Sequence, residues 1–223
     1  MQTGVHPLLV QSKAVAFTTS LTFREFLDLS PTLAAFLQRR YDEIRLPLPA
    51  QTFFLTYPDV LNFIVLVNEE SPDTWVVLPI LVRIARASPR FTLRILRDSD
   101  DLSMLAALAE ELDLNNNLAE LDLPLLLVFD EEWDFQGQWG PHPQEAERYL
   151  EEWFERNPAY ETLAEADTPV DQENYAALLE ELTHEMRVWY NTDLNYACAQ
   201  EVHELLASFL DEGEADEQDA GER

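Results

Sequence analysis

Four consecutive residues, Ser71, Pro72, Asp73 and Thr74, have types and spacing that could support chemistry. They follow the apolar run Leu61–Val67 and open a helical pattern, so their hydroxyl and carboxylate groups would lie at a helix N-terminus. The first turn of a helix offers unpaired backbone N–H groups and the positive end of the helix dipole. The same residues also suit a structural role, because serine caps helices, proline fits the first position and aspartate fits the first turn. Both interpretations stay open.

Alternating strand and helix patterns surround this turn and would position it. The predicted strands are Leu61–Val67, Phe91–Leu96, Leu125–Phe129 and an antiparallel Phe135–Trp139. The first predicted helix begins at a capping box formed by Thr22 and Glu25. Further helices are predicted at residues 31–43, 73–87, 100–112, 143–156, 172–189 and 195–210. Pro47 and Pro49 are expected to break the helical pattern after residue 43. This alternation predicts an α/β layer fold.

Composition divides the chain into four expected regions. Residues 1–50 are a helical lead-in, residues 51–160 the α/β core, and residues 161–210 a helical extension. Residues 211–223 form an acidic tail that is poor in apolar residues, so we expect it to be disordered.

The region from Asn62 to Glu155 resembles the thioredoxin superfamily, and more narrowly a bacterial thioredoxin-like family with helical extensions at both ends. Ser71 and Thr74 stand where that family has the cysteines of Cys-x-x-Cys, and Pro79 matches its helix-kinking proline. Leu123-Pro124 directly precedes the third core strand, where the superfamily has a cis-proline. The resemblance implies a thioredoxin-like fold with a central mixed sheet flanked by helices, and a cis bond at Leu123-Pro124.

Two later features extend the resemblance, and one residue departs from it. The hairpin Leu125–Trp139 and the following Gly140 match the family's last strands and the glycine that lines its substrate groove. Glu70 replaces the tryptophan that usually precedes the first cysteine. Because the hydroxyls of Ser71 and Thr74 cannot form or resolve a mixed disulfide, we do not expect thiol-disulfide exchange.

The resemblance implies a groove built from Ser71, Pro72, Asp73, Thr74, Leu123, Pro124 and Gly140. We predict a non-catalytic binding or scaffold module that takes an extended segment of an unidentified peptide or protein in this groove. The alternative is an enzyme that handles glutathione or another thiol, with Ser71 as hydrogen-bond donor. Neither a cofactor nor a catalytic residue is expected for the binding module.

Other residues that could support chemistry have structural interpretations. Glu181 and His184 share a helix face, with His203 further on, but this spacing alone is a weak metal signal, and we expect a solvated face and no metal site. The only cysteine, Cys198, lies in an apolar helical pattern and is expected to be buried. In the segment Met186–Tyr190, the side chains could anchor a partner or pack on the core, and we expect packing.

The charge of the chain excludes some classes of partner. Its 43 acidic and 14 basic residues give a net charge of −29, which disfavours binding to nucleic acid. Two explanations stay open for this acidity: adaptation to a salty cytoplasm, or a specific basic partner.

No run of 18 or more apolar residues is present, so we expect no membrane span. A single cysteine and the lack of a signal-like N-terminus favour a cytoplasmic location.

Overall fold

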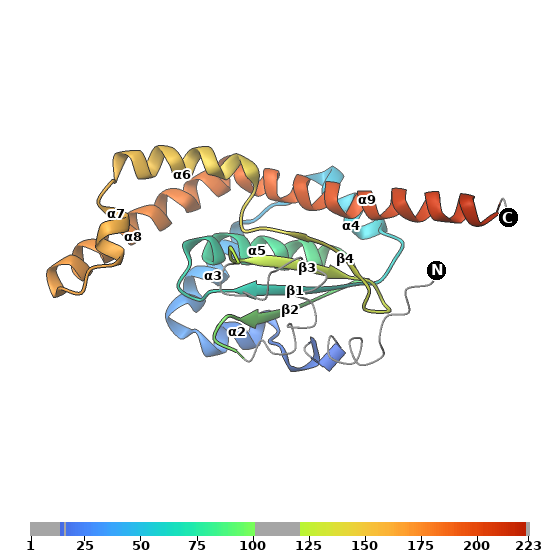
Figure 1. Cartoon of the computed structure of the whole chain (residues 1–223), viewed down its shortest axis with the longest axis horizontal. Helices are drawn as coiled ribbons and strands as arrows, with labels where there is room; N and C mark the ends of the chain where they lie inside the picture. Colours follow the sequence, from blue (N-terminus) through green and yellow to red (C-terminus); the bar gives the residue numbers. More distant parts are fainter. Residues whose placement is uncertain (1–13, 16, 101–120, 222–223) are drawn as a thin grey trace.

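A central sheet of four strands organises the molecule (Figure 1). The computed structural model describes residues 14–15, 17–100 and 121–221, with the backbone alone for 211–221. The strands are β1 (Leu61–Val67), β2 (Phe91–Arg97), β3 (Leu125–Phe129) and β4 (Phe135–Trp139), in the order β2-β1-β3-β4. Strand β2 is parallel to β1, whereas β3 is antiparallel to β1 and β4 to β3. The predicted α/β fold with a mixed sheet flanked by helices is confirmed.

The two central strands are buried on both faces. Six of the seven residues of β1, all except Asn62, and all of β3 are buried, as their apolar runs predict. The register places Leu61 opposite Phe91 and Ile64 opposite Leu127. Strand β1 therefore holds the start of the following helix at a fixed place beside the centre of the sheet.

The helices largely match those predicted. They are α2 (Phe23–Leu29), α3 (Pro31–Glu43), α4 (Leu48–Thr56), α5 (Pro72–Ala87), α6 (Gln144–Arg156), α7 (Tyr160–Ala164), α8 (Pro169–Trp189), the π-helical turn η3 (Tyr190–Leu194) and α9 (Asn195–Gly221). The capping box of Thr22 and Glu25 is present. Helix α4 was not predicted, because Pro47 and Pro49 indicated a break; instead they stand at its N-cap and first turn, where proline is tolerated. The predicted helix 100–112 lies outside the described residues.

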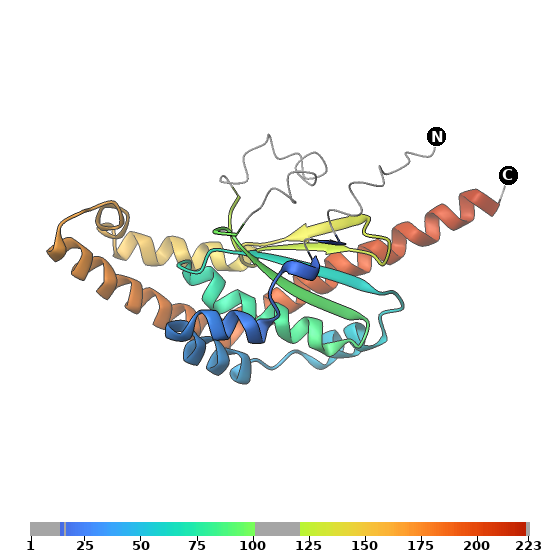
Figure 2. The same cartoon turned by 90° about the horizontal axis from the view of Figure 1, so that it is seen from below.

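Helices α8 and α9 join through η3 into one long bent arm that passes the sheet and α6 (Figures 1 and 2). The predicted end of the last helix at residue 210 is wrong, because α9 continues to Gly221. The backbone of 211–221 is thus helical where we expected disorder. Its glutamate, alanine and glutamine residues are good helix formers, so a low apolar content did not end the helix.

Helix α5 lies at the centre of the hydrophobic core. It packs on the sheet with one side, and α3, α4, α8 and α9 contact its other sides. Leu78, Leu81, Val82 and Ala85, which share one face of α5, are buried, but so are Val76, Val77, Ile80 and Ile84. The core continues without a break into side chains of the C-terminal arm, among them Met186, Leu194 and Val202. Among the described residues, no helix combines the length and apolar character that a membrane crossing requires.

Candidate functional site

The turn before α5 is held in place by backbone and side-chain hydrogen bonds that do not involve the Ser71 hydroxyl. The backbone N–H of Glu70 donates to Asn68 Oδ1 at 2.7 Å, and Trp75 Nε1 donates to the Glu69 carbonyl at 2.7 Å. The Glu69 carboxylate accepts a hydrogen bond from Ser30 and pairs with Arg97 Nη1 at 3.5 Å. These contacts bind the turn to α3 and β2, so the start of α5 is preorganised.

Ser71 and Thr74 differ in exposure, but neither side-chain hydroxyl makes a capping hydrogen bond at the start of α5. Ser71 occupies the N-cap position of α5 and its carbonyl accepts from Trp75 N at 3.2 Å, yet its hydroxyl makes no capping hydrogen bond. Thr74 is fully buried, and its Oγ1 has no hydrogen-bond partner among the described residues. Ser71 therefore occupies the N-cap position that the structural interpretation gave it, but without a side-chain capping hydrogen bond. Both hydroxyls keep their donor capacity.

Pro124 and Gly140 meet on the other side of the candidate site. The Leu123-Pro124 bond is cis, as the resemblance implied, and so is Gly140-Pro141. Gly140 has a φ of 138°, and a Cβ atom there would lie 2.2 Å from the Pro124 carbonyl oxygen. Only glycine allows this close approach of the two backbones.

A histidine that the sequence did not indicate links this side to α5. His142 follows the Gly140 loop, and its Nδ1 lies 3.1 Å from Asp73 Oδ1. Burial lowers the pKa of His142, but the hydrogen bond and charge of Asp73, with the charges of Glu147 and Asp122, raise it overall. Asp73 and His142 thus form a partly buried pair at the N-terminus of α5. Sequence reasoning missed it because the two residues are 69 positions apart.

A small hollow lies next to this pair. It has a volume of about 340 Å³ and is lined by residues of the Gly140 loop and by Glu147 and Glu201. Glu201 of α9 accepts hydrogen bonds from Trp139 Nε1 at 2.7 Å and from Gln144 N at 2.9 Å. The C-terminal arm therefore fixes the loop that carries Gly140 and His142.

Taken together, the predicted site residues form two linked groups. The structure brings Pro124 against Gly140, and it brings Asp73 to the Gly140 loop through His142. The hydrogen bonds and ion pairs of the described residues do not connect Ser71 or Thr74 with either group. Ser71 and Thr74 thus lie at the N-terminus of α5, whereas Glu147 and Glu201 line the separate hollow beside the Gly140 loop.

The other predicted candidates are placed as structural residues. Cys198 is fully buried in the core, and this burial raises the pKa of its thiol well above the ordinary value. Glu181 and His184 are exposed on α8, whereas His203 lies on α9 with its ring 4.0 Å from that of Phe53. No group of three or more metal-ligating side chains occurs within residues 14–15, 17–100 and 121–221.

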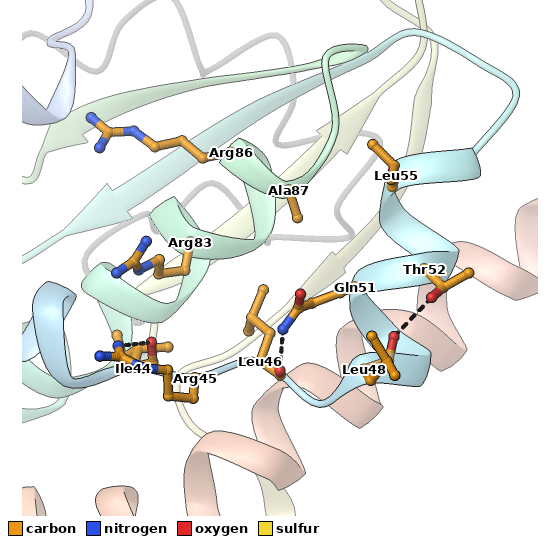
Figure 3. A pocket seen from close by; sticks show the side chains of 10 residues that line it. All are labelled: Ile44, Arg45, Leu46, Leu48, Gln51, Thr52, Leu55, Arg83, Arg86 and Ala87. Carbon is orange, nitrogen blue, oxygen red and sulfur yellow. Dashed lines mark hydrogen bonds between the residues drawn. The ribbon is translucent and has the colours of Figure 1, made fainter.

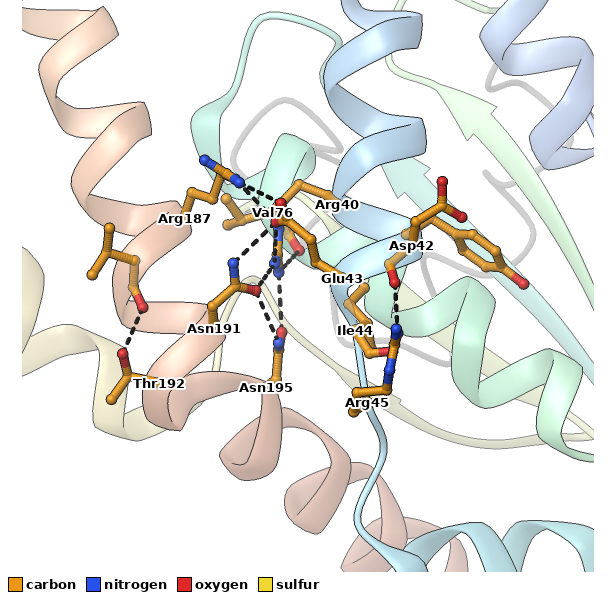
Figure 4. Close-up of polar contacts among 12 residues, drawn as sticks. Arg40, Asp42, Glu43, Ile44, Arg45, Val76, Arg187, Asn191, Thr192 and Asn195 are labelled. Carbon is orange, nitrogen blue, oxygen red and sulfur yellow. Dashed lines mark hydrogen bonds and ion pairs between the residues drawn. The ribbon is translucent and has the colours of Figure 1, made fainter.

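A buried arginine joins the C-terminal arm to the core (Figure 4). Arg40 of α3 is fully buried and donates to Asn191 Oδ1 at 2.5 Å, to Asn195 Oδ1 at 3.0 Å and to the Val76 carbonyl of α5 at 3.3 Å. Burial lowers its pKa to about 10, opposed by the nearby Glu43 carboxylate, so it stays charged at neutral pH. The asparagines flank or lie in η3, and π-helical turns often mark functional or strained positions.

Glu43 completes this cluster from the end of α3. Its carboxylate accepts hydrogen bonds from Arg187, one of them from Nε at 2.9 Å, and from Asn191 Nδ2 at 3.0 Å. The hydrogen bonds from Arg187 lower the pKa of Glu43 to about 2, although partial burial opposes them. Tyr190 is fully buried and Trp189 packs on Tyr149, so the segment Met186–Tyr190 packs on the core as expected.

Comparison with known proteins adds a family and a fold. A family model described as Thioredoxin matches residues 20–154, which extends the match to α2, α3 and α4. The chain is similar to the crystal structure of an HIV epitope scaffold, with 18% identity, a TM-score of 0.52, and coverage of 87% of this chain and 97% of that chain. It is also similar to a protein of unknown function from Pseudomonas aeruginosa, with 21% identity, a TM-score of 0.49, and coverage of 86% and 95%. No curated protein sequence matches. At this identity, the likeness to the scaffold shows the fold alone.

Proposed function

The chain belongs to the thioredoxin family, and from this premise we propose that it is a non-catalytic member with a degenerate Ser-x-x-Thr site, which binds an extended peptide or protein segment at the N-terminus of α5. The groove of this proposal consists of Ser71–Thr74 on one side and of Leu123-Pro124 with Gly140 on the other. Extended segments bind such places through backbone hydrogen bonds, with side-chain pockets supplying selectivity.

The observation that carries this proposal is the position of the only thiol in the chain. Cys198 is the only cysteine, and it is 0% exposed with a raised thiol pKa. Disulfide exchange requires an accessible thiolate, and the hydroxyls of Ser71 and Thr74 are far weaker acids. The family's dithiol mechanism therefore has no reactive group at the turn where it would operate.

The charges around the turn indicate the chemistry of the partner. Glu69, Glu70 and Asp73 lie at the start of α5, and Glu147 and Glu201 line the neighbouring hollow. The neighbouring cation Arg97 is already ion-paired with Asp100, since Arg97 Nη2 lies 2.6 Å from Asp100 Oδ1. An extended segment that carries lysine or arginine next to its groove-binding residues would complement this acidic rim.

The same charges argue against the alternative of a glutathione-linked enzyme. Glutathione carries two carboxylates, and the acidic side chains Glu70 and Asp73 next to Ser71 would repel them. A thermal-shift titration with glutathione separates the two functions. The binding module predicts an unchanged melting temperature, whereas the enzyme predicts a rise with glutathione concentration.

Binding to a peptide array tests the groove directly. Ser71→Trp fills the proposed groove without breaking a hydrogen bond, because the Ser71 hydroxyl makes none in the described part of the chain. Ser208→Trp, at an exposed position of α9 whose hydroxyl donates only to the Leu205 carbonyl of the same helix, is the control. We expect arrayed basic extended peptides to bind the wild type and the control but not Ser71→Trp. Equal binding by all three proteins would contradict a site at this turn.

Composition supports the remaining parts of the proposal. A single cysteine agrees with a cytoplasmic location, where disulfides are rare. A net charge of −29 agrees with a salty cytoplasm, in which ions screen repulsion between carboxylates. The basic segment proposed as partner would bind less tightly in such a solution, so binding should be measured across a range of salt concentrations.

A further inference from the structure

A pocket at the other end of α5 is lined by arginines and leucines and contains no acidic residue (Figure 3). Its volume is about 500 Å³, within the range of small-molecule sites. Arg83 and Arg86 come from α5, Arg45 from the connection between α3 and α4, and Leu48 and Leu55 from α4. In a chain with 43 acidic and 14 basic residues, three cations around one pocket without an acidic neighbour in its lining are unexpected.

The three guanidinium groups have no carboxylate partner among the described residues, and each keeps free donors. Arg83 donates from Nε to the Tyr41 carbonyl at 2.9 Å, and Arg86 donates from Nη1 to Tyr41 Oη at 2.8 Å. Arg45 uses one nitrogen, Nη1, for the carbonyls of Asp42 and Ile44, at 2.5 and 2.9 Å. A guanidinium has five N–H donors, so most remain available to a ligand.

Tyr41 holds two of these arginines in position. The central carbon of the Arg83 guanidinium lies 4.0 Å from the centre of the Tyr41 ring, and that of Arg86 lies 4.9 Å from it. Such stacking fixes the guanidinium planes before a ligand arrives, which reduces the ordering cost of binding. Arg86 also complements the negative end of the α5 dipole, but this structural role does not consume its N–H donors.

The opposite wall of the pocket carries exposed leucine side chains beside the polar Gln51 and Thr52. Leu48 is 74% exposed and Leu55 is 60% exposed, although both belong to a helix whose Ala50 and Phe54 are buried. Figure 3 shows these leucines on α4, across from the arginines of α5. The pocket therefore has a cationic side and an opposite side on which exposed leucine surface adjoins two polar side chains.

We propose that this pocket binds a small amphipathic anion, with a phosphate or carboxylate head on Arg45, Arg83 and Arg86 and an aliphatic part against Leu48 and Leu55. Guanidinium groups bind both kinds of head through paired charge-assisted hydrogen bonds. The aliphatic part would cover leucine surface that the fold leaves in water. This site is at the opposite end of α5 from the proposed peptide groove and does not depend on it.

Calorimetric titration with four probes tests the pocket. The probes are hexyl phosphate, hexanoate, inorganic phosphate and hexanol. We expect hexyl phosphate or hexanoate to bind at least about tenfold more tightly than inorganic phosphate, because a six-carbon chain adds buried apolar surface. Hexanol should not bind measurably. Equal binding of hexanol and hexyl phosphate, or no binding of any anionic probe, would overturn the proposal.

Variants separate a built site from a general effect of charge. Arg86→Gln and Arg45→Gln should each weaken binding of the anionic probes about tenfold, whereas Arg148→Gln, an exposed position on α6, should not. Leu48→Gln leaves the core intact, because Leu48 is exposed. This variant should weaken the binding of hexyl phosphate but leave the affinity for inorganic phosphate unchanged. If Arg148→Gln weakens binding as much as Arg86→Gln, the site is refuted.

Sedimentation with vesicles identifies the source of the head group. Vesicles of phosphatidylcholine with phosphatidic acid would carry down the wild type but not Arg86→Gln if the ligand is a lipid head group. Binding of the free probes without sedimentation indicates a soluble ligand. Sedimentation of both proteins alike would contradict a role of the pocket at the vesicle surface.

Discussion

Two polar regions contact helix α5, and they use their polar groups differently. In the cluster around Arg40, the side chains of Arg40, Glu43, Arg187, Asn191 and Asn195 are joined by short hydrogen bonds. At the N-terminus of the helix, the Ser71 hydroxyl makes no capping bond and the buried Thr74 hydroxyl has no partner in the described structure. The Arg40 cluster bonds most of its groups internally, although Arg40 Nε has no partner among the described residues, whereas neither hydroxyl at the N-terminus of α5 makes a capping hydrogen bond.

This difference separates structure from function. The Arg40 cluster joins α3, α5 and the C-terminal arm, so its hydrogen bonds stabilise the arrangement of the helices. A buried hydroxyl without a partner destabilises the fold by about 1–3 kcal/mol. Under the proposed function a ligand supplies the acceptor at Ser71, whereas the buried Thr74 hydroxyl, like the buried Arg40 Nε and Tyr190 Oη, destabilises the fold.

The largest expected effect is on the Arg40 cluster. Arg40→Met removes the buried cation, leaves Asn191 and Asn195 without their shared donor, and takes away the Arg40 charge that lies 4.0 Å from the Glu43 carboxylate. We expect the free energy of unfolding in urea to fall by about 3–5 kcal/mol. Arg24→Met breaks an exposed ion pair with Asp28 and should cost less than about 1 kcal/mol. If both variants lose equally little, the cluster does not hold the arm to the core.

A smaller effect is expected from Glu43, which is partly exposed and therefore partly screened by solvent. Its pKa is about 2 in the folded protein against 4.5 for the unperturbed group. A lowered pKa stabilises the fold above the unfolded pKa, and this contribution is lost as pH falls from about 4.5 to 2. Wild type should be more stable than Glu43→Gln at pH 6, with the difference approaching zero near the folded pKa of about 2. A constant difference across this range would show that Glu43 is not ion-paired.

The smallest effect is expected at Thr74. Thr74→Val keeps the shape of the side chain and removes its unpaired buried hydroxyl, so the free energy of unfolding should rise by about 1 kcal/mol. Thr183→Val is the control, because Thr183 Oγ1 donates to the Leu179 carbonyl at 2.7 Å, and it should lose about 1 kcal/mol. Destabilisation by both substitutions would mean that the Thr74 hydroxyl is bonded in the folded protein.

Sequence patterns predicted the parts of the fold that depend on local signals. Three elements were predicted from residues close together in the sequence. They are the strand of the apolar run Leu61–Val67, the helix that begins at the capping box of Thr22, and the apolar strand after Pro124. Helix α4 was missed because proline is found both after the end of a helix and in the first turn of the next one. Pro47 and Pro49 were interpreted only as a helix end. The helical conformation of the backbone of 211–221 was not predicted, because a low apolar content was taken to indicate disorder. Low apolar content reduces packing against the core but does not prevent a helix.

The chemistry of the sites was predicted less well, because it depends on distant residues. Arg40 looks like one half of a surface Arg-Arg pair, and its partners Asn191 and Asn195 are 151 and 155 positions away. Likewise, no local pattern pairs His142 with Asp73. The arginines of the pocket were counted in the composition, but only the packing of α4 against α5 brings them to one place.

Reduction of insulin disulfides by dithiothreitol tests the central claim most directly, which is that the turn at Ser71–Thr74 keeps the place of a redox site without its chemistry. We expect the wild type to leave the rate at its protein-free value, because Cys198 is buried with a raised pKa. The double variant Ser71→Cys/Thr74→Cys should accelerate the reaction, because it places two thiols at the N-terminus of α5. Acceleration by the wild type, or an inert double variant whose thiols react with a thiol reagent, would contradict the account.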